Sequence, residues 1–218
     1  MLVIDTATQA TVVGVALGDE IVERRHDPEP GERPGHVSQV LALAEEALAA
    51  AGATLADMER IGVGIGPGSF TGLRIGIATA RALSHASGVP LAAVSTLGAL
   101  AVAAGDEPVL AVLDARRGEA FVALWRAGVQ VSAPRAVKPE ELAAAAAGAT
   151  LAVGDGALRF REQLEPAGIT VPEGGSALHR VGAAGLARLA AQAPLVARDA
   201  LLPEYVRSPD AKPRSEQR

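Results

Sequence analysis

Residues 1–8 read Met-Leu-Val-Ile-Asp-Thr-Ala-Thr, a short apolar run that ends in the acidic residue Asp5 and in polar turn residues. The same pattern returns at residues 108–114, Pro-Val-Leu-Ala-Val-Leu-Asp, where the apolar run ends in Asp114. Short apolar runs bounded by turn residues are typical of strands. The chain therefore contains two leading strands, and an aspartate closes each of them.

The order of elements after each leading strand is also repeated. In the first half, hydrophobic periodicity predicts strands at residues 11–17 and 21–25, a helix from Val37 to Ala51, a strand at 61–65, a helix to about Ser87, a strand at 89–94 and a helix at 96–103. In the second half it predicts strands at 119–125 and 129–132, a helix at 139–147, a strand at 150–153 and an amphipathic helix at 177–192.

Two packed α/β lobes of the βββαβαβα type, with a cleft between them, make up the actin-like ATPase (ASKHA) fold. We therefore expect an α/β protein with one lobe at residues 1–106 and a second, reduced lobe at 107–207. Residues 208–218 are rich in charge and contain two prolines, so we expect a disordered tail there.

The composition excludes several classes of protein. The 218 residues include no cysteine, which excludes disulfides, thiolate zinc sites and cysteine nucleophiles. The net charge of −5 argues against a protein that wraps nucleic acid by itself, because phosphate binding requires a basic face. No apolar run reaches the roughly 18 residues that a membrane span requires, and the start of the chain is unlike a signal peptide. We expect a soluble, cytoplasmic protein.

The stretch Gly-Pro-Gly-Ser-Phe-Thr-Gly at residues 66–72 lies between a predicted strand and a predicted helix. Backbone N–H groups at the start of a helix can bind an anion, but the stretch is also consistent with a tight turn in which Ser69 caps the helix. It matches neither the Walker A pattern nor the dinucleotide-binding glycine pattern. The residues that would contact an anion or a nucleotide are Gly66, Gly68, Ser69, Thr71 and Gly72.

The helix after this turn carries a stripe of small residues, Gly72, Gly76 and Ala80, at a spacing of four. Glycine inside a helix costs about 1 kcal/mol relative to alanine, so a second backbone is expected to pack closely against the stripe. That backbone belongs either to the protein's own sheet or to a helix of a second subunit. The sequence alone favours neither.

Residues for metal binding or catalysis are largely lacking in the sequence. The four histidines form neither an HxxxH nor an HExxH pattern. Asp5 and Asp114 stand where actin-like ATPases position magnesium or phosphate, but we interpret both as acids that cap turns. Arg116 and Arg117 follow Asp114 and are candidates for contact with a partner's carboxylate or an RNA phosphate.

Three stretches together resemble the TsaB (YeaZ) family: residues 3–8, Val-Ile-Asp-Thr-Ala-Thr, residues 66–76, Gly-Pro-Gly-Ser-Phe-Thr-Gly-Leu-Arg-Ile-Gly, and residues 114–119, Asp-Ala-Arg-Arg-Gly-Glu. The resemblance extends to about Arg207. It implies a Gcp-like variant of the actin-like fold and a non-catalytic scaffold in the synthesis of threonylcarbamoyladenosine (t6A). The modified base is adenosine 37 of tRNAs that read ANN codons. The implied partners are the paralogous transferase TsaD, in a heterodimer, and the ATPase TsaE, with tRNA bound only through the complex.

The resemblance also has implications for individual residues. The metal-binding histidines of the paralogue correspond to Thr96 and Leu100, which are not ligands for iron or zinc. The first two helices form the dimer contact of the family. That contact maps onto Val37, Val40, Leu41, Leu48, Gly72, Leu73, Gly76, Ile77 and Ala80. We expect no tightly bound cofactor. A nucleotide at a subunit boundary and a homodimer of the isolated chain stay open.

Two other interpretations remain. The chain could be an independent enzyme of the actin-like fold, either a nucleotide-dependent phosphotransferase or an M22-like peptidase. It could also contact tRNA directly, and the residues for that contact would be Arg24, Arg25, Arg33, Arg116 and Arg117.

Overall fold

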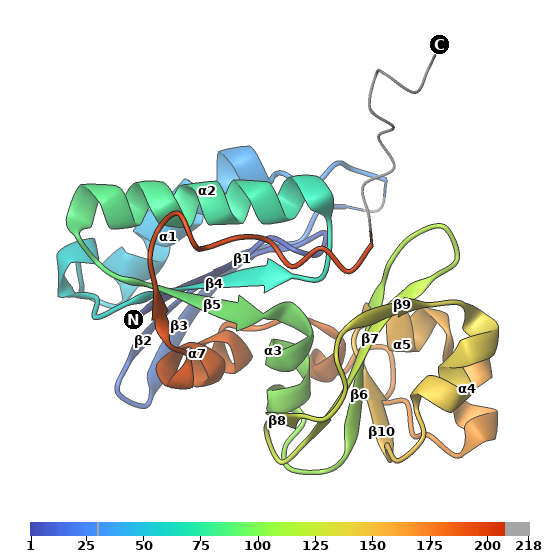
Figure 1. The fold of residues 1–218 in the computed structure, drawn as a ribbon. Helices are drawn as coiled ribbons and strands as arrows, with labels where there is room; N and C mark the ends of the chain where they lie inside the picture. Colours follow the sequence, from blue (N-terminus) through green and yellow to red (C-terminus); the bar gives the residue numbers. More distant parts are fainter. Residues whose placement is uncertain (30, 208–218) are drawn as a thin grey trace.

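The structure, a computed structural model, describes residues 1–29 and 31–207 (Figure 1). It contains two β-sheets, one formed mainly by the first half of the chain and one by the second half. Helices cover both sheets, as expected for an α/β protein. The tail expected at residues 208–218 lies outside the described residues. Within the described part of the chain, no helix combines the length and the apolar character that a membrane crossing needs.

The first sheet has six strands in the order β11-β5-β4-β1-β2-β3. β1 pairs antiparallel with β2 and parallel with β4, and β2 forms a hairpin with β3. The predicted three-strand meander at the start of the chain is therefore confirmed. The strands are β1 (Leu2–Asp5), β2 (Thr11–Leu17), β3 (Glu20–His26), β4 (Ile61–Gly66), β5 (Leu91–Ser95) and β11 (Leu195–Val196).

Helices lie on both faces of the first sheet. Side chains alternate along a strand, so Leu2 and Ile4 of β1 join the hydrophobic cluster under the first two helices, whereas Val3 joins the cluster on the opposite face. The short 3-10 helix η1 precedes β4. The helices of this half are α1 (His36–Ala50), η1 (Leu55–Asp57), α2 (Phe70–Ser87) and α3 (Thr96–Ala103).

The second sheet has the strand order β10-β6-β7-β8, and β9 also pairs with β7. Its covering helices are short, as expected for a reduced lobe. The strands are β6 (Val109–Asp114), β7 (Ala120–Arg126), β8 (Val129–Gln130), β9 (Arg135–Val137) and β10 (Leu151–Val153). The helices of this half of the chain are η2 (Pro139–Glu141), α4 (Leu142–Ala145), α5 (Asp155–Arg159), α6 (Arg161–Leu164), η3 (Glu165–Ala167), η4 (Ala177–His179) and α7 (Ala183–Gln192). The last of them, α7, packs on the first sheet.

Two predicted helices differ from the structure. The helix expected at residues 139–147 is split into η2 and the short α4. The helix expected at 177–192 is interrupted, because Arg180 and Gly182 are extended. His179 explains the interruption: its buried ring lies within hydrogen-bond distance of the carbonyl oxygens of Gly154 (2.9 Å) and Pro172 (3.0 Å). These contacts hold η4 against the second sheet and separate it from α7.

The last part of the chain returns to the first sheet. α7 packs on that sheet, where a Cβ on Gly14 would lie 2.3 Å from the Cβ of Ala183, and one on Gly62 would lie 2.6 Å from that of Ala190. The two glycines therefore make room for the helix. β11 then pairs with β5 at the edge of the same sheet. The expected boundary between the two lobes at residues 106 and 107 stays a prediction. If the chain is divided there, α7 and β11 still belong to the first lobe, because both pack on the first sheet.

One hydrophobic cluster joins the two halves at the base of the cleft. It contains Val3 of β1, Leu100 of α3, Trp125 of β7 and Leu186 of α7. Nearly every residue of α3 is buried, because the helix packs against α7 on one side and against β6 and β7 on another. α3 and α7 are therefore the apolar connection between the sheets.

Candidate functional site

Asp5 at the end of β1 is fully buried and serves the fold. Its carboxylate accepts a hydrogen bond from the N–H of Ala7 at 2.8 Å and another from the hydroxyl of Thr96 at 2.8 Å. A Cβ on Gly64 would lie 1.9 Å from Oδ2, so β4 closes off the carboxylate on that side. Burial raises the pKa of Asp5 to about 6. The interpretation of Asp5 as a turn-capping acid is confirmed.

Asp114 repeats this arrangement at the end of β6. Its Oδ1 accepts the N–H of Arg116 at 2.8 Å, two residues ahead, as Asp5 does with Ala7. Its Oδ2 accepts a hydrogen bond from Arg159 at 2.8 Å. Asp114 is also a turn-capping acid, but it lines the space between the two sheets. The two halves of the chain therefore share this hydrogen bond after their leading strands, although Arg116 has a positive φ and Ala7 does not.

The glycine-rich turn packs against the turn after β1. The hydroxyl of Ser69 accepts the N–H of Gly72 at 3.2 Å, which confirms Ser69 as the N-cap of α2. The N–H of Ser69 donates to the carbonyl of Ala7 at 2.7 Å, and a Cβ on Gly68 would lie 2.4 Å from that oxygen. The backbone of the glycine-rich turn thus approaches the backbone at Ala7 so closely that a residue with a side chain would not fit at Gly68.

The stripe of small residues on α2 faces the protein's own sheet. Thr6 donates from its hydroxyl to the carbonyl of Gly72 at 2.7 Å. Cβ atoms on Gly72 and Gly76 would lie 2.0 Å from the carbonyl oxygen and 2.4 Å from the hydroxyl oxygen of Thr6. Ala80 is fully buried. The expectation that this stripe contacts a second subunit is therefore corrected, because the β1–β2 turn already occupies its face.

The other expected interface residues divide into two groups. Val40, Leu73 and Ile77 are buried in the protein's own core, so they are not exposed for contact with a partner, which corrects the expectation for them. Val37 and Leu41 on α1 are 76% and 51% exposed, and Leu48 on the same side of the helix is partly buried. The accessible part of the expected contact is thus the outer side of α1.

A cavity of about 500 Å³ lies in the cleft between the two sheets. Five separate parts of the chain form its wall: residues 7–9, 67–71, 113–117 with Phe121, Asp155, and 204–207. It includes Gly68, Ser69 and Thr71 of the glycine-rich turn, but not Gly66 or Gly72. Burial raises the pKa values of Asp155 and Glu204 above their usual range.

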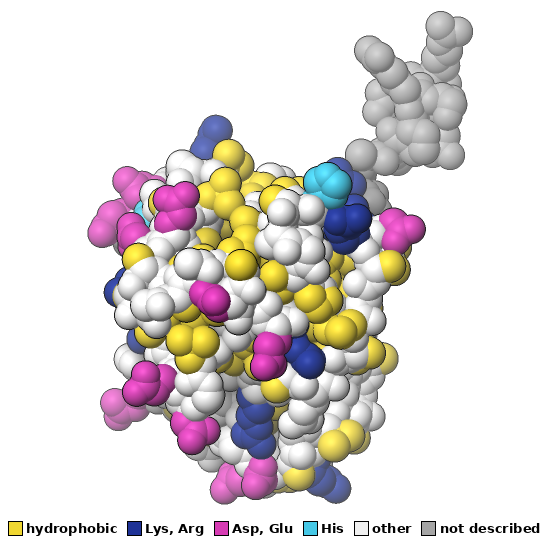
Figure 2. Space-filling view, turned by 90° about the vertical axis from the view of Figure 1, so that its left-hand side faces the viewer, with side chains coloured by type: hydrophobic (Ala, Val, Ile, Leu, Met, Phe, Trp, Pro, Cys, Tyr) yellow, Lys and Arg dark blue, Asp and Glu magenta, His cyan; other side chains and the backbone are white. Residues whose placement is uncertain are grey.

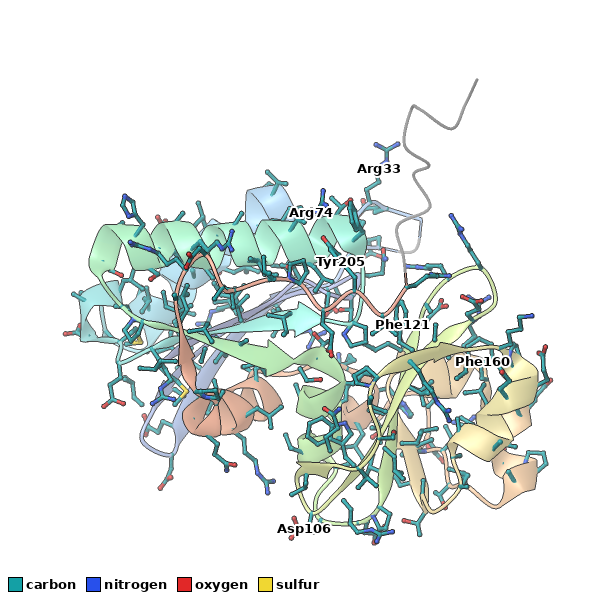
Figure 3. All side chains as sticks on the ribbon, in the orientation of Figure 1. Arg33, Arg74, Asp106, Phe121, Phe160 and Tyr205 are labelled. Carbon is teal, nitrogen blue, oxygen red and sulfur yellow. The ribbon has the colours of Figure 1, made fainter. Side chains whose placement is uncertain are left out.

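Aromatic residues are concentrated at this cavity. The chain has one Trp, one Tyr and three Phe, and three of these five side chains, Phe70, Phe121 and Tyr205, line the wall. Figure 3 shows Tyr205 beneath the start of α2, near Arg74, with Phe121 on the side of the second sheet. Tyr205 belongs to the C-terminal segment. The sequence did not predict a role for that segment, because the segment has no periodic hydrophobic pattern.

Arg116 and Arg117 stand in the β6–β7 turn at the mouth of the cavity. Both have positive φ, 63° and 55°, a region that L-residues adopt at a cost of about 1–2 kcal/mol each. The guanidinium group of Arg116 lies 3.9 Å from Asp114 and is largely exposed. Among the other arginines considered for RNA contact, Arg25 is engaged by Asp27 and by the carbonyl of Val181.

The strained turn gives a testable result. Arg116→Gly is expected to raise the free energy of unfolding by about 0.5–1 kcal/mol, because glycine adopts positive φ without the steric cost of a side chain and loses part of that gain in the unfolded chain. Urea unfolding of the two proteins measures the difference. A loss of more than 0.5 kcal/mol would mean that the arginine side chain, rather than the backbone conformation, stabilises the turn.

Metal-ligating side chains do not gather in the described part of the chain. Within residues 1–29 and 31–207 there is no group of three or more His, Cys, Asp or Glu side chains that could hold a metal ion. Thr96 is buried and hydrogen-bonded to Asp5, and Leu100 is buried in the cluster that joins the two sheets. Both positions therefore serve the fold.

Comparison with known proteins assigns the chain to a family. The family model described as TsaD, tRNA N6-adenosine threonylcarbamoyltransferase, matches residues 28–173. The tRNA threonylcarbamoyladenosine biosynthesis protein TsaB of Escherichia coli is 38% identical over 130 residues, which cover 58% of this chain and 54% of that protein. TsaB of Haemophilus influenzae is 34% identical over 125 residues, covering 56% and 51%. An uncharacterized protein of Mycobacterium leprae is 37% identical over 148 residues, 65% of this chain and 40% of its own length. The matches thus span about half the length of these curated relatives.

Solved structures agree with the fold. YeaZ from Pseudomonas aeruginosa superposes with a TM-score of 0.78 at 27% identity, over 94% of this chain and 98% of that chain. The ethanolamine utilization protein EutJ from Carboxydothermus hydrogenoformans has a TM-score of 0.52 at 16% identity, over 86% and 89%, and is similar in fold alone. The predicted actin-like (ASKHA, Gcp-like) α/β fold is confirmed. The chain belongs to the TsaD family of tRNA N6-adenosine threonylcarbamoyltransferases and, within it, to the TsaB (YeaZ) group.

Proposed function

We propose that this protein acts in t6A synthesis as a non-catalytic scaffold in the cytoplasm that binds a TsaD-type transferase. The printed names of the E. coli and H. influenzae relatives support a role in this modification. In this proposal a TsaE-type ATPase is the third component, tRNA is bound through the complex, and the chain itself carries no tightly bound cofactor.

The proposal of a non-catalytic role rests on one observation: Asp5 and Thr96 are buried and hydrogen-bonded to each other inside the fold. In an enzyme of this architecture, the acid after the first strand would face the cleft. Here the carboxylate of Asp5 is directed into the sheet, is fully buried and is bonded to the backbone and to Thr96. It does not line the cavity between the sheets. Contact with a partner is then what the protein contributes.

The outer side of α1 is the surface we assign to that contact. Val37 and Leu41 lie one helical turn apart and are both more than half exposed, and Leu48 continues the row. Exposed apolar side chains in such a row favour packing against a helix of another protein. In Figure 2, which views the molecule from the left side of Figure 1, charged side chains of both signs are scattered, with acidic ones toward the left and lower edges. Among the described residues on that side of the molecule, Figure 2 shows no extended basic patch of the kind that RNA binding requires.

Charge placed in the row is expected to break the contact. Leu41→Glu is expected to weaken binding to the TsaD-type subunit by about 100-fold, because a carboxylate would be buried against apolar groups of the partner. Ala42→Glu adds the same charge at the next residue, which is exposed and lies about 100° around α1 from Leu41, outside the apolar row, and is the matched control. Affinity is measured by titration calorimetry with both purified proteins, after circular dichroism has established that each variant folds.

Equal affinities for Leu41→Glu, Ala42→Glu and the parent protein would contradict the assigned surface. Modification of tRNA in a mixture of the TsaD-type and TsaE-type subunits without this chain would contradict the scaffold role itself. Turnover of ATP or hydrolysis of a peptide by the isolated chain would favour the alternative, an independent enzyme.

A further inference from the structure

The C-terminal segment from Leu201 to Arg207, called here the strap, is anchored to the first sheet. Leu201 is buried in the cluster beneath α1 and α2. Arg81 of α2 donates to the carbonyls of Asp199 (3.1 Å) and Leu201 (2.9 Å), which fixes the turn that enters the strap. The N–H of Glu204 then donates to the carbonyl of Ile65 in β4 at 2.7 Å. The first part of the strap is thus held by the core and by backbone bonds.

The middle of the strap is attached to the start of α2 by a cluster of rings and charge. Tyr205 stacks on Phe70, with ring centroids 5.2 Å apart and an interplanar angle of 28°. The guanidinium group of Arg74 lies 3.7 Å from the centroid of Phe70, and its Nε donates to the hydroxyl of Tyr205 at 3.0 Å. All three side chains are exposed at their outer edges, so the cluster faces water.

The end of the strap crosses to the second sheet. Arg207 donates to the carboxylate of Glu119 at 2.6 Å and to the carbonyl of Ala115 at 2.5 Å, both in the β6–β7 turn. Its guanidinium group also lies 5.7 Å from the ring centroid of Phe121 in β7. A single side chain of the strap therefore binds the opposite side of the cleft at three points.

The strap lies over the cavity, opposite the permanent connection of the sheets. Residues 204–207 form part of the cavity wall. Figure 1 shows the C-terminal segment running beneath α2 toward the second sheet. At the base of the cleft the sheets share a buried apolar cluster that includes α3 and α7. At the mouth, by contrast, the strap's link to the second sheet is a partly exposed ion pair and a few polar and ring contacts. Contacts of that kind are individually weak and open locally before the core does.

We propose that Tyr205 and Arg207 form a releasable latch that holds the two lobes closed over the interlobe cavity. The hinge is the α3–α7 connection at the base of the cleft. Release of Arg207 from the β6–β7 turn lets the lobes separate and exposes the wall of the cavity to solvent. The strap thereby controls access to the cleft of this fold.

The chain lacks cysteine, so a single introduced thiol reports on access to the cavity. Thr8→Cys places that thiol on the wall, and its rate of alkylation by a maleimide is measured in the full chain. Tyr205→Ala combined with Arg207→Ala is expected to raise the rate about 10-fold, because opening of the cleft becomes more frequent. Leu202→Ala, which removes a strap side chain that is 62% exposed, is the matched control and is expected to leave the rate unchanged.

A second measurement follows the lobes directly. Glu45 of α1 and Glu162 of α6 are both exposed, one on each lobe. Each is replaced by cysteine and carries a spin label, and pulsed electron resonance gives the distribution of distances between the two labels. Removal of the latch is expected to broaden this distribution and shift it to longer distances. Unchanged alkylation and an unchanged distribution in the folded double variant would overturn the proposal. If the double variant does not fold, the test is made with Arg207→Gln, which removes the guanidinium group that contacts Glu119 and Ala115 but keeps a polar side chain, and which is expected to change both readouts in the same direction.

Discussion

Gly72→Ala is expected to destabilise the protein by about 3 kcal/mol and to lower the melting temperature by about 10 °C. The added Cβ would lie 2.0 Å from the carbonyl oxygen of Thr6, and backbone at that distance has to move. The better helix propensity of alanine returns only about 1 kcal/mol. α2 would have to shift away from the turn after β1.

The matched control for this change is Gly174→Ala. Gly174 is exposed, and a Cβ there meets no atom within 4 Å, so the variant is expected to melt within about 2 °C of the parent protein. Thermal and urea unfolding measure both variants. A stable Gly72→Ala protein that fails only in binding its partner would restore the interpretation of the small-residue stripe as an intermolecular contact.

The free energy of unfolding is expected to fall by about 3 kcal/mol as the pH rises and Asp5 loses its proton, and Asp5→Asn is expected to abolish this pH dependence. Burial raises the pKa of Asp5 from 3.8 to about 6, so between these pH values the folded state binds more protons than the unfolded state. The contribution of Asp5 is therefore complete below pH 4 and is lost as the pH rises through about 6. Each pKa unit corresponds to about 1.36 kcal/mol, which gives the magnitude.

Asparagine keeps the hydrogen bonds without the charge. Its carbonyl oxygen can accept the N–H of Ala7, and its amide can donate to the hydroxyl of Thr96. The free energies of unfolding of the two proteins are compared at pH 4 and pH 7.5 in urea. From pH 4 to pH 7.5, the free energy of unfolding of the variant is expected to rise by about 3 kcal/mol relative to that of the parent protein. Parallel pH profiles would mean that Asp5 titrates normally and is not held as the structure has it.

Much of the first half of the fold was predicted from the sequence, because its signals are local. The alternation of β1, the hairpin that follows it and the helical period of α1 each lie within a few residues. The N-cap Ser69 was also predicted, since a cap depends on the residues next to it. Asp5 and Asp114 were identified as turn-capping acids for the same reason.

The remainder depends on contacts between distant parts of the chain. Gly72 and Gly76 predicted a close neighbour, but only the folded chain identifies that neighbour as Thr6. The cavity is formed by five segments, and its strap is positioned by Phe70 and Glu119, far from Tyr205 and Arg207 in sequence. The break before α7 depends on the contacts of His179 with Gly154 and Pro172. No local pattern encodes such pairs.

The central claim is that this chain supports t6A synthesis through contact and not through chemistry in its own cleft. The most direct test is the formation of t6A on tRNA by the TsaD-type and TsaE-type subunits, with the parent chain, with Asp5→Asn or with no chain. The account predicts full product with the parent and with Asp5→Asn, and none without the chain. Loss of product with Asp5→Asn, in a complex that still assembles, would contradict it.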